Sequence, residues 1–223
     1  MAQYRIRQYR DGDYEAVRTL FARGILELAP AAYRRLLTWG RAQLGLLALA
    51  AGVRAAAGGW APALAAAALV LLAAWPLVRS LTTSYVRDAL GADLRDIRAS
   101  YLQAPDSGFW VAEAGGAVVG MVAAVPAAEP AALELKRMSV RRDQRGRGIA
   151  RALAREVLRF AQARGYGAVV LYTSVVQTAA QRLYEGQGFR RVGAFSPSLL
   201  ASLLHFQVLH YRCELPAAPP PAP

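Results

Sequence analysis

A short glycine-containing segment in the second half of the chain has the residue types and spacing to bind a phosphate group. Residues 133–140 predict a strand, and residues 148–164 predict a helix with its apolar residues on one face. Gly146 and Gly148 lie between them, where the absence of a Cβ lets the backbone turn tightly and approach a ligand. The backbone N–H groups of residues 146–150 then lack helical partners at a helix N-terminus, where the helix dipole favours an anion. The segment therefore predicts a site for a pyrophosphate.

Two common nucleotide-binding patterns do not fit this segment. The dinucleotide pattern G-x-G-x-x-G needs a third glycine where the chain has Arg151, and the Walker pattern needs a Gly-Lys-Ser/Thr that is missing. The pattern that fits is Arg-x-x-Gly-x-Ala at 145–150, which resembles the acetyl-CoA signature of the GCN5-related N-acetyltransferase (GNAT) superfamily. The sequence ELKRMSV at 134–140 and the A-x-x-L-Y-x-x-x-G-F element at 180–189 are also similar to that superfamily.

The resemblance implies an α/β fold with a mixed sheet, in which two central strands splay apart and the pantetheine arm of acetyl-CoA pairs with backbone. It also implies acetyl-CoA as co-substrate and no metal. Gln177 corresponds to a polar residue near the cofactor in many members, although a role at the start of a helix is the alternative. The implied cofactor-binding residues are Met138, Ser139, Val140, Arg145, Gly146, Arg147, Gly148, Ile149, Ala150 and Gln177.

Acetyl transfer from a thioester requires a neutral amine, a stabilised oxyanion and a proton for the leaving thiolate. In the superfamily the tyrosine of the L-Y element supplies that proton, which makes Tyr184 the candidate general acid; the alternative is a tyrosine that packs a helix onto the sheet. A phenol with a pKa of about 10 stays protonated at neutral pH and can donate. Glu134 is the candidate base, acting through water, and its alternative is a solvated residue or a salt bridge to Lys136 or Arg137.

A long apolar region precedes these motifs. Residues 42–53 and 55–78 carry no charged side chain, Arg54 separates them, and Gly-Gly-Trp-Ala-Pro at 58–62 predicts a turn. A membrane helix needs about 20 apolar residues, and the second run is long enough. The first run reaches that length only if it extends backwards through Leu36, Leu37 and Trp39 with Arg41 snorkelling. We therefore expect two helices that form a membrane hairpin or a re-entrant loop, with a buried soluble hairpin or a single span as alternatives. The basic residues on both flanks (Arg34, Arg35, Arg41, Arg79 and Arg87) predict that both ends of the hairpin are cytosolic.

The order of motifs, with this apolar insert, is similar to the camello-like N-acetyltransferases, a family that includes enzymes of the endoplasmic reticulum acting on cysteine S-conjugates and on aspartate. The resemblance implies an endoplasmic reticulum membrane enzyme with its catalytic domain facing the cytosol. The expected acceptor is the α-amino group of a cysteine S-conjugate, with protein lysine and aspartate as rivals. A non-catalytic acyl-CoA-binding membrane protein is the alternative from another class.

Composition excludes several further classes. The 223 residues have a net charge of +12, but 55% of them are hydrophobic, and this high hydrophobicity excludes an intrinsically disordered chain. One cysteine (Cys213) and two histidines (His205 and His210) cannot build a disulfide framework or a Cys/His zinc site. The sequence contains no basic motif interleaved with aromatic residues, so nothing in it indicates nucleic-acid binding. We expect four segments: an N-terminal strand and helix (1–35), the hairpin insert (36–80), the catalytic domain (81–215) and a disordered proline-rich tail (216–223).

Overall fold

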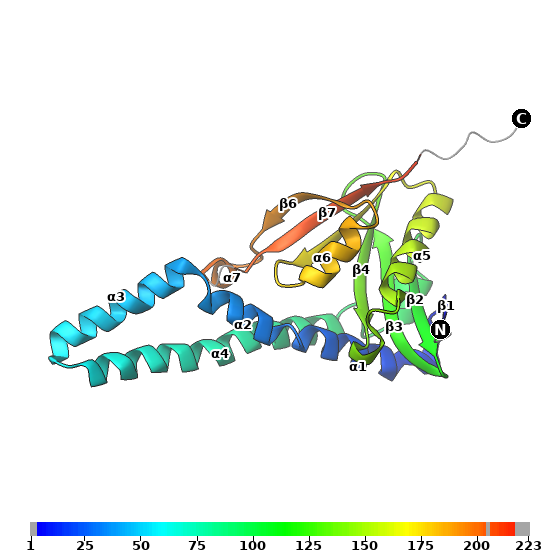
Figure 1. The fold of residues 1–223 in the computed structure, drawn as a ribbon. Helices are drawn as coiled ribbons and strands as arrows, with labels where there is room; N and C mark the ends of the chain where they lie inside the picture. Colours follow the sequence, from blue (N-terminus) through cyan, green and yellow to red (C-terminus); the bar gives the residue numbers. More distant parts are fainter. Residues whose placement is uncertain (1–3, 204–205, 217–223) are drawn as a thin grey trace, which may run out of the picture.

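The computed structural model describes residues 4–203 and 206–216, so His205 and most of the expected tail lie outside the described residues. A mixed sheet forms the centre of the α/β domain, with strand order β1-β2-β3-β4-β5-β7-β6 (Figure 1). The strands are β1 (Tyr4–Gln8), β2 (Gly108–Ala114), β3 (Ala117–Pro126), β4 (Ala132–Val140), β5 (Ala168–Ser174), β6 (Arg190–Phe195) and β7 (Val208–Glu214). The expected α/β fold with a mixed sheet is confirmed.

The two central strands separate partway along their length. Strands β4 and β5 pair in parallel only from Ala132 to Leu135 on β4, opposite Ala168 to Leu171 on β5. Beyond that point β4 stays paired with β3 on its other side, and β5 stays paired with β7. The backbone edge of β4 that faces β5 is therefore open from Lys136 onward.

Helices cover both faces of the sheet. Helix α5 (Ile149–Ala163) packs Leu153 and Val157 against one face, in a core shared with Leu135 of β4. Helix α1 (Tyr14–Leu26) covers the other face over β3 and β4, as the third-and-fourth-residue spacing of its apolar side chains predicts. The remaining short elements are η1 (Asp11–Asp13), a π-helical turn η2 (Arg98–Leu102), η3 (Arg142–Gln144), α6 (Thr178–Glu185) and α7 (Leu199–Leu203).

The apolar region forms a pair of helices that project from the α/β domain (Figure 1). Helix α3 (Gly40–Ala57) is followed by a turn at Gly58, whose positive φ of 70° suits glycine, and by α4 (Trp60–Gly91). The expected two helices with a turn at Gly58–Gly59 are present. Helix α4 is long and apolar enough to cross a membrane, with a mean hydropathy of 2.1 in its most apolar window.

Two details of the hairpin differ from the sequence interpretation. The apolar run does not extend backwards as one helix through Leu36 and Trp39, because α2 (Ala29–Leu37) ends at Thr38, whose hydroxyl donates to the carbonyl oxygens of Arg34 and Arg35. The chain then bends by 63° before α3. At the other end, α4 runs without a break past residue 80 to Gly91, so that the hairpin helix itself enters the core of the α/β domain.

Candidate active site

The open edge of β4 comprises the strand's last residues, including Met138, Ser139 and Val140. The Ser139 hydroxyl donates to the carbonyl oxygen of Leu20 in α1 at 3.3 Å, so its side chain is turned toward that helix. Gly24 allows this close approach, because a Cβ there would lie 2.5 Å from the Ser139 oxygen. The backbone of β4 facing β5 is free to pair with an extended ligand arm.

The glycine loop that follows β4 presents backbone donors at the start of α5. Gly146 and Gly148 have φ angles of 79° and 81°, in the left-handed region that favours glycine. The N–H groups of residues 146–150 make no hydrogen bond to the part of the chain that the structure describes. These donors at a helix N-terminus fit a phosphate group.

Two arginines of this loop have different surroundings. The Arg145 side chain donates to the carbonyl oxygen of Val140 at 3.0 Å and pairs at 2.8 Å with Glu27, the residue that follows α1, so it braces the loop against the end of that helix. Arg147 is exposed, and within the described ranges it has no ion pair. Arg147 is thus available to an anion, while Arg145 contributes by holding the loop.

A bulge in β4 lies where the strand leaves β5. Arg137 has a φ of 57°, which is rare for a residue with a side chain, and the register between β3 and β4 shifts there. Its guanidinium donates to both carboxylate oxygens of Asp93 at 2.8 and 2.5 Å and to the Tyr85 hydroxyl at 3.0 Å. The Tyr101 hydroxyl also donates to Asp93. This cluster joins the bulge to the end of the hairpin helix.

Glu134 lies on β4 just before the strands separate. Strand alternation directs it to the same face as Ala132 and Val170, the face opposite α5. The expected alternative of a salt bridge to Arg137 is not observed, because Arg137 pairs with Asp93; Glu134 forms no ion pair or hydrogen bond with the described residues. Tyr172 lies on the same face of β5, two residues beyond Val170, the register partner of Glu134. Burial, and then the charges of Glu129 and Glu134, raise the pKa of the Tyr172 phenol.

Tyr184 lies on the other side of the sheet. It is buried in α6 and packs in the core that includes Leu133 and Leu135, with ring contacts to Phe189 and Tyr211. Its hydroxyl has no hydrogen-bond partner among the described residues, and burial raises the pKa of the phenol above its usual value. The proton therefore remains on Tyr184 at neutral pH. Glu134 and Tyr184 thus flank the separation of β4 and β5 from opposite faces.

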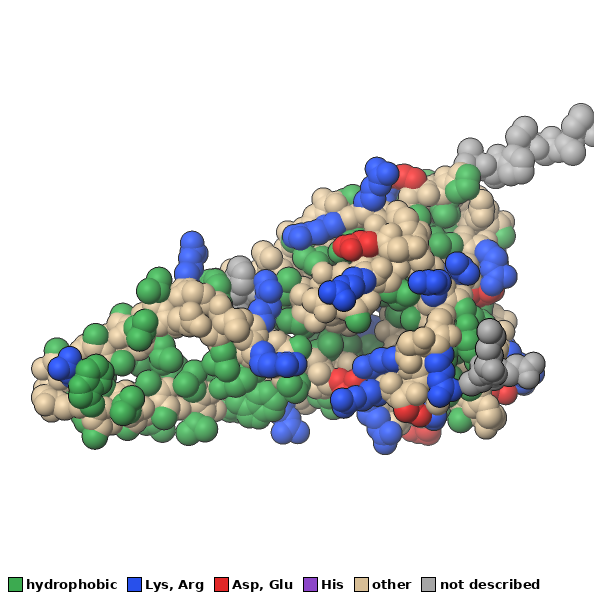
Figure 2. Space-filling view, viewed as in Figure 1, with side chains coloured by type: hydrophobic (Ala, Val, Ile, Leu, Met, Phe, Trp, Pro, Cys, Tyr) green, Lys and Arg blue, Asp and Glu red, His purple; other side chains and the backbone are tan. Residues whose placement is uncertain are grey.

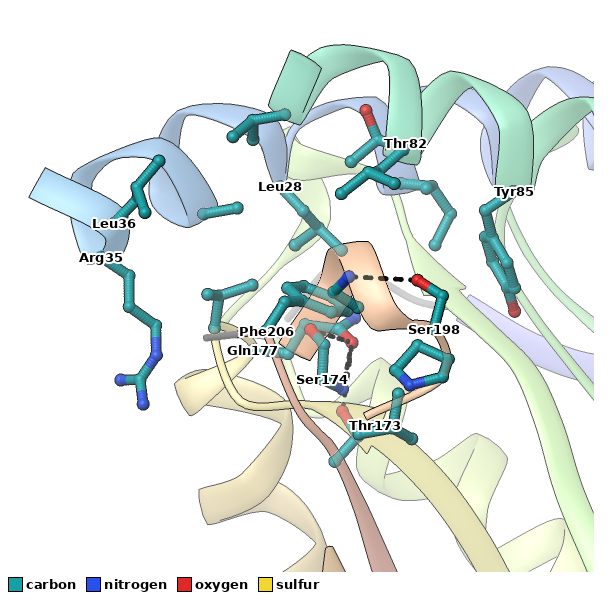
Figure 3. Close-up of a pocket in the computed structure, with 18 of the residues that line it drawn as sticks. Leu28, Arg35, Leu36, Thr82, Tyr85, Thr173, Ser174, Gln177, Ser198 and Phe206 are labelled. Carbon is teal, nitrogen blue, oxygen red and sulfur yellow. Dashed lines mark hydrogen bonds between the residues drawn. The ribbon is translucent and has the colours of Figure 1, made fainter. Parts of the chain in front are cut away.

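A cavity of about 340 Å³ lies beside the C-terminal end of β5 (Figure 3). Helices α2 and α4 form one wall, and the end of β5 with the segment before β7 forms the other. Most of the lining is apolar, including Leu28, Leu36 and Phe206. The Gln177 side-chain oxygen accepts hydrogen bonds from the Ser174 backbone N–H and hydroxyl, both at 3.0 Å, and thereby fixes the turn that ends β5 at the cavity.

Comparison with known proteins identifies the family. The acetyltransferase (GNAT) family profile matches residues 75–189. The chain is 40% identical over 222 residues to N-acetyltransferase 8 of Mus musculus, covering 98% of each protein. It is 41% identical over 221 residues to N-acetyltransferase family 8 member 2 of Rattus norvegicus, covering 97% of each. The chain belongs to the GNAT acetyltransferase family.

The relatives of this acetyltransferase extend over its whole length, hairpin included, and confirm the expected membership of the camello-like group. N-acetyltransferase 8B of Homo sapiens is 40% identical over 222 residues and covers 98% of each chain. Among solved structures, a GNAT acetyltransferase from Staphylococcus aureus Mu50 aligns with a TM-score of 0.58 and 16% identity, covering 96% of this chain and 100% of that one. The structural likeness shows the fold.

A GNAT acetyltransferase moves acetyl from acetyl-CoA to an acceptor amine. The open edge of β4 and the free N–H groups of residues 146–150 fit the arm and phosphates of that co-substrate. In the described part of the chain no group of three or more His, Cys, Asp or Glu side chains is arranged to hold a metal ion.

Sequence reasoning missed three residues of this acetyltransferase that the structure brings to the site. Arg137 was considered only as a partner for Glu134, and Asp93 lies 44 residues away in the chain, so no local pattern joins them. Arg35 was counted only among the basic flanks, yet it lines the cavity. No sequence pattern predicts the contacts of Arg137 or Arg35, so only the tertiary structure reveals them.

Proposed function

We propose that this protein is a membrane-anchored N-acetyltransferase that transfers acetyl from acetyl-CoA to the α-amino group of cysteine S-conjugates. The observation that carries the proposal is the apolar cavity beside the separation of β4 and β5. Its walls suit an apolar substituent on sulfur, because burying apolar area stabilises a complex by about 25 cal/mol per Å². The polar end of such an acceptor would face the reacting centre.

In this proposal Glu134 accepts the proton of the acceptor amine through a water molecule, and Tyr184 donates a proton to the leaving thiolate. The position of the two side chains on opposite faces supports this division, because the amine nitrogen forms its bond to the carbonyl carbon from one side while the bond from that carbon to the CoA sulfur breaks on another. The backbone of Met138, Ser139 and Val140 aligns the pantetheine arm. The phosphates bind at residues 145–150, and Gln177 holds the end of β5 against the cofactor.

We also propose that helices α3 and α4 insert into the membrane. Their surface carries large exposed apolar side chains, which Figure 2 shows along the projection. Leu64, Leu69 and Leu72 of α4 are 65%, 66% and 70% exposed, a degree that is costly in water. At the tip the Arg54 guanidinium stacks over the Trp60 ring at 4.2 Å, a pairing suited to a polar interface.

The proposed location is the endoplasmic reticulum membrane with the catalytic domain on the cytosolic side. The basic residues at both ends of the hairpin support cytosolic ends. The particular membrane follows from the resemblance to the camello-like enzymes.

The acceptor is tested with the full chain purified in detergent and supplied with acetyl-CoA and several amines. These are S-benzyl-cysteine, aspartate and a lysine-containing peptide. The proposal predicts N-acetylation of S-benzyl-cysteine at the lowest concentration. Preferred acetylation of aspartate or of the peptide would reassign the acceptor, and transfer to none of several amines, with acetyl-CoA still bound, would favour a non-catalytic acyl-CoA-binding protein.

A further inference from the structure

One charged side chain lines the otherwise uncharged cavity. Among the described lining residues, Arg35 of α2 is the only one that carries a charge. Its Nε atom is buried and has no hydrogen-bond partner, and no described residue forms an ion pair with it. Three other partly buried arginines of the domain have partners: Arg7 pairs with Asp13 at 2.6 Å, Arg137 pairs with Asp93 at 2.5 Å, and Arg18 donates to the carbonyl oxygens of Leu90 and Leu94. A buried guanidinium nitrogen without a hydrogen-bond partner costs free energy unless a ligand supplies an acceptor.

The cavity has two distinguishable ends. Figure 3 shows Tyr85 and Arg35 on opposite sides of it, on α4 and α2 respectively. The Tyr85 hydroxyl accepts a hydrogen bond from Arg137, so the Tyr85 end adjoins the bulge of β4 where the strands separate. The Arg35 end is therefore the end remote from the reacting centre, and apolar residues such as Leu28 and Phe206 lie between the two.

We propose that Arg35 binds a carboxylate at the far end of the acceptor's apolar substituent. This inference deepens the proposed function and rests on it. The preferred acceptor then has three parts in order: the amine near β4, an apolar segment in the cavity and an anion at Arg35. A guanidinium binds a carboxylate through two parallel hydrogen bonds, and the low polarity of the surrounding wall strengthens that attraction. Arg35 is thus a specificity-determining residue remote from the chemistry.

The test compares straight-chain S-alkyl-cysteines with analogues in which a carboxylate replaces the terminal methyl group. Binding to the detergent-purified full chain is measured by calorimetry with CoA present, so that no turnover occurs. In Arg35→Gln the best-bound carboxylated analogue should bind about 10- to 100-fold more weakly, the loss typical of a hydrogen bond to a charged group, while the alkyl compound is unchanged. Arg35→Lys should restore part of the loss because it keeps the charge.

Arg34→Gln is the matched control, since Arg34 is the neighbouring exposed arginine and does not line the cavity. Its binding of both compounds should equal that of the unaltered protein. The proposal would be overturned if Arg35→Gln changed the binding of both compounds equally, or changed neither. We would also measure flotation of the protein with anionic vesicles. If Arg35→Gln weakened only this flotation, Arg35 would be assigned to lipid and the proposal would be overturned. Binding is measured without turnover, so the Arg35 site and the proposed function can fail separately. If the unaltered protein acetylates no amine but Arg35→Gln still loses binding of the carboxylated analogue alone, the proposed function is contradicted and the Arg35 site is supported.

Discussion

Arg137, in the bulge of β4, is joined by two hydrogen bonds to Asp93, which follows the end of the hairpin helix α4. The side chains are only 10% and 20% exposed, so the pair is largely withdrawn from water. Tyr85, on the last turns of α4, bonds to the same guanidinium. The strand expected to hold the pantetheine arm and the helix expected to enter the membrane therefore share one polar cluster.

Asp93→Asn should destabilise the protein by about 3 kcal/mol, because removing one partner leaves the Arg137 charge buried and uncompensated. Thermal unfolding of the full chain in detergent measures the change. Asp11→Asn is the control, since the Asp11–Arg98 pair is exposed and should contribute little. An equal effect of both substitutions would contradict the central role given to the Arg137–Asp93 pair.

The same pair predicts a dependence of stability on pH. Burial opposes ionisation of Asp93, but hydrogen bonds from Arg137 and Tyr101 outweigh it and lower the pKa of the carboxyl group. A lowered pKa in the folded state stabilises the protein above the unfolded-state pKa, about 3.9 for aspartate, and this stabilisation is lost as the pH falls through the folded-state pKa. The difference in unfolding temperature between the unaltered protein and Asp93→Asn should therefore shrink below about pH 4. A difference that stays constant down to strongly acidic pH would refute this.

Gly148→Val should abolish acetyl-CoA binding measured by calorimetry. A β-branched residue is strained at the positive φ of 81°, so the loop that presents the N–H groups has to change its conformation. Gly165→Val is the matched control, because Gly165 has a similar φ of 76° in the turn after α5 and belongs to no proposed site. It should lose stability and still bind acetyl-CoA. Retained binding in Gly148→Val would remove the glycine loop from the site.

Tyr184→Phe should lower kcat by about 10²- to 10⁴-fold, the usual contribution of a general acid, and leave acetyl-CoA binding unchanged. The phenylalanine keeps the ring contacts with Phe189 and Tyr211 and removes a hydroxyl that bonds to no described residue, so unfolding should be unaffected. Tyr211→Phe is the comparison, since the Tyr211 hydroxyl donates to Glu185 at 2.8 Å and has a structural role. Full activity in Tyr184→Phe would show that Tyr184 only packs α6 onto the sheet.

Lysine substitution at Leu69 and Leu72 should weaken association with vesicles in a flotation assay. Each lysine costs about 3 kcal/mol at the centre of a membrane helix. Val192→Lys is the control, because Val192 is 54% exposed on β6, away from the hairpin. Unchanged flotation of the double variant would contradict insertion of α4.

Local patterns predicted the elements that short-range physics controls. Gly58 stands at the expected turn with a positive φ, and the strand, glycine loop and helix around Gly148 have the expected order. The end of α2 before Thr38 was not predictable from hydrophobicity, because apolar residues continue on both sides of it; the chain leaves the helical conformation at Trp39, whose backbone is extended. The continuity of α4 to Gly91 was also missed, because the uncharged run that defined the second hairpin helix ends at residue 78, before Arg79.

The features of the candidate site also fall into two groups: those that local sequence predicts and those that depend on tertiary packing. The N–H groups of the glycine loop follow from the sequence, because helix geometry leaves them unpaired. The bulge at Arg137 depends on pairing between β3 and β4, and the position of Arg35 at the cavity depends on the packing of α2 against α4; both are tertiary features. The sequence could not tell whether Glu134 forms a salt bridge with Arg137, because the alternative partner of Arg137, Asp93, lies far away in the chain.

The most direct test of the account is the initial rate of acetyl transfer to S-benzyl-cysteine by Glu134→Gln and by the unaltered protein. Glu134 bonds to no described residue, so the substitution should leave folding and acetyl-CoA binding intact and isolate the proton transfer. We expect product from the unaltered protein and a rate about 10²- to 10⁴-fold lower in the variant, the range for loss of a general base. Equal rates in the two proteins, with equal acetyl-CoA binding, would contradict the proposed catalytic centre between β4 and β5.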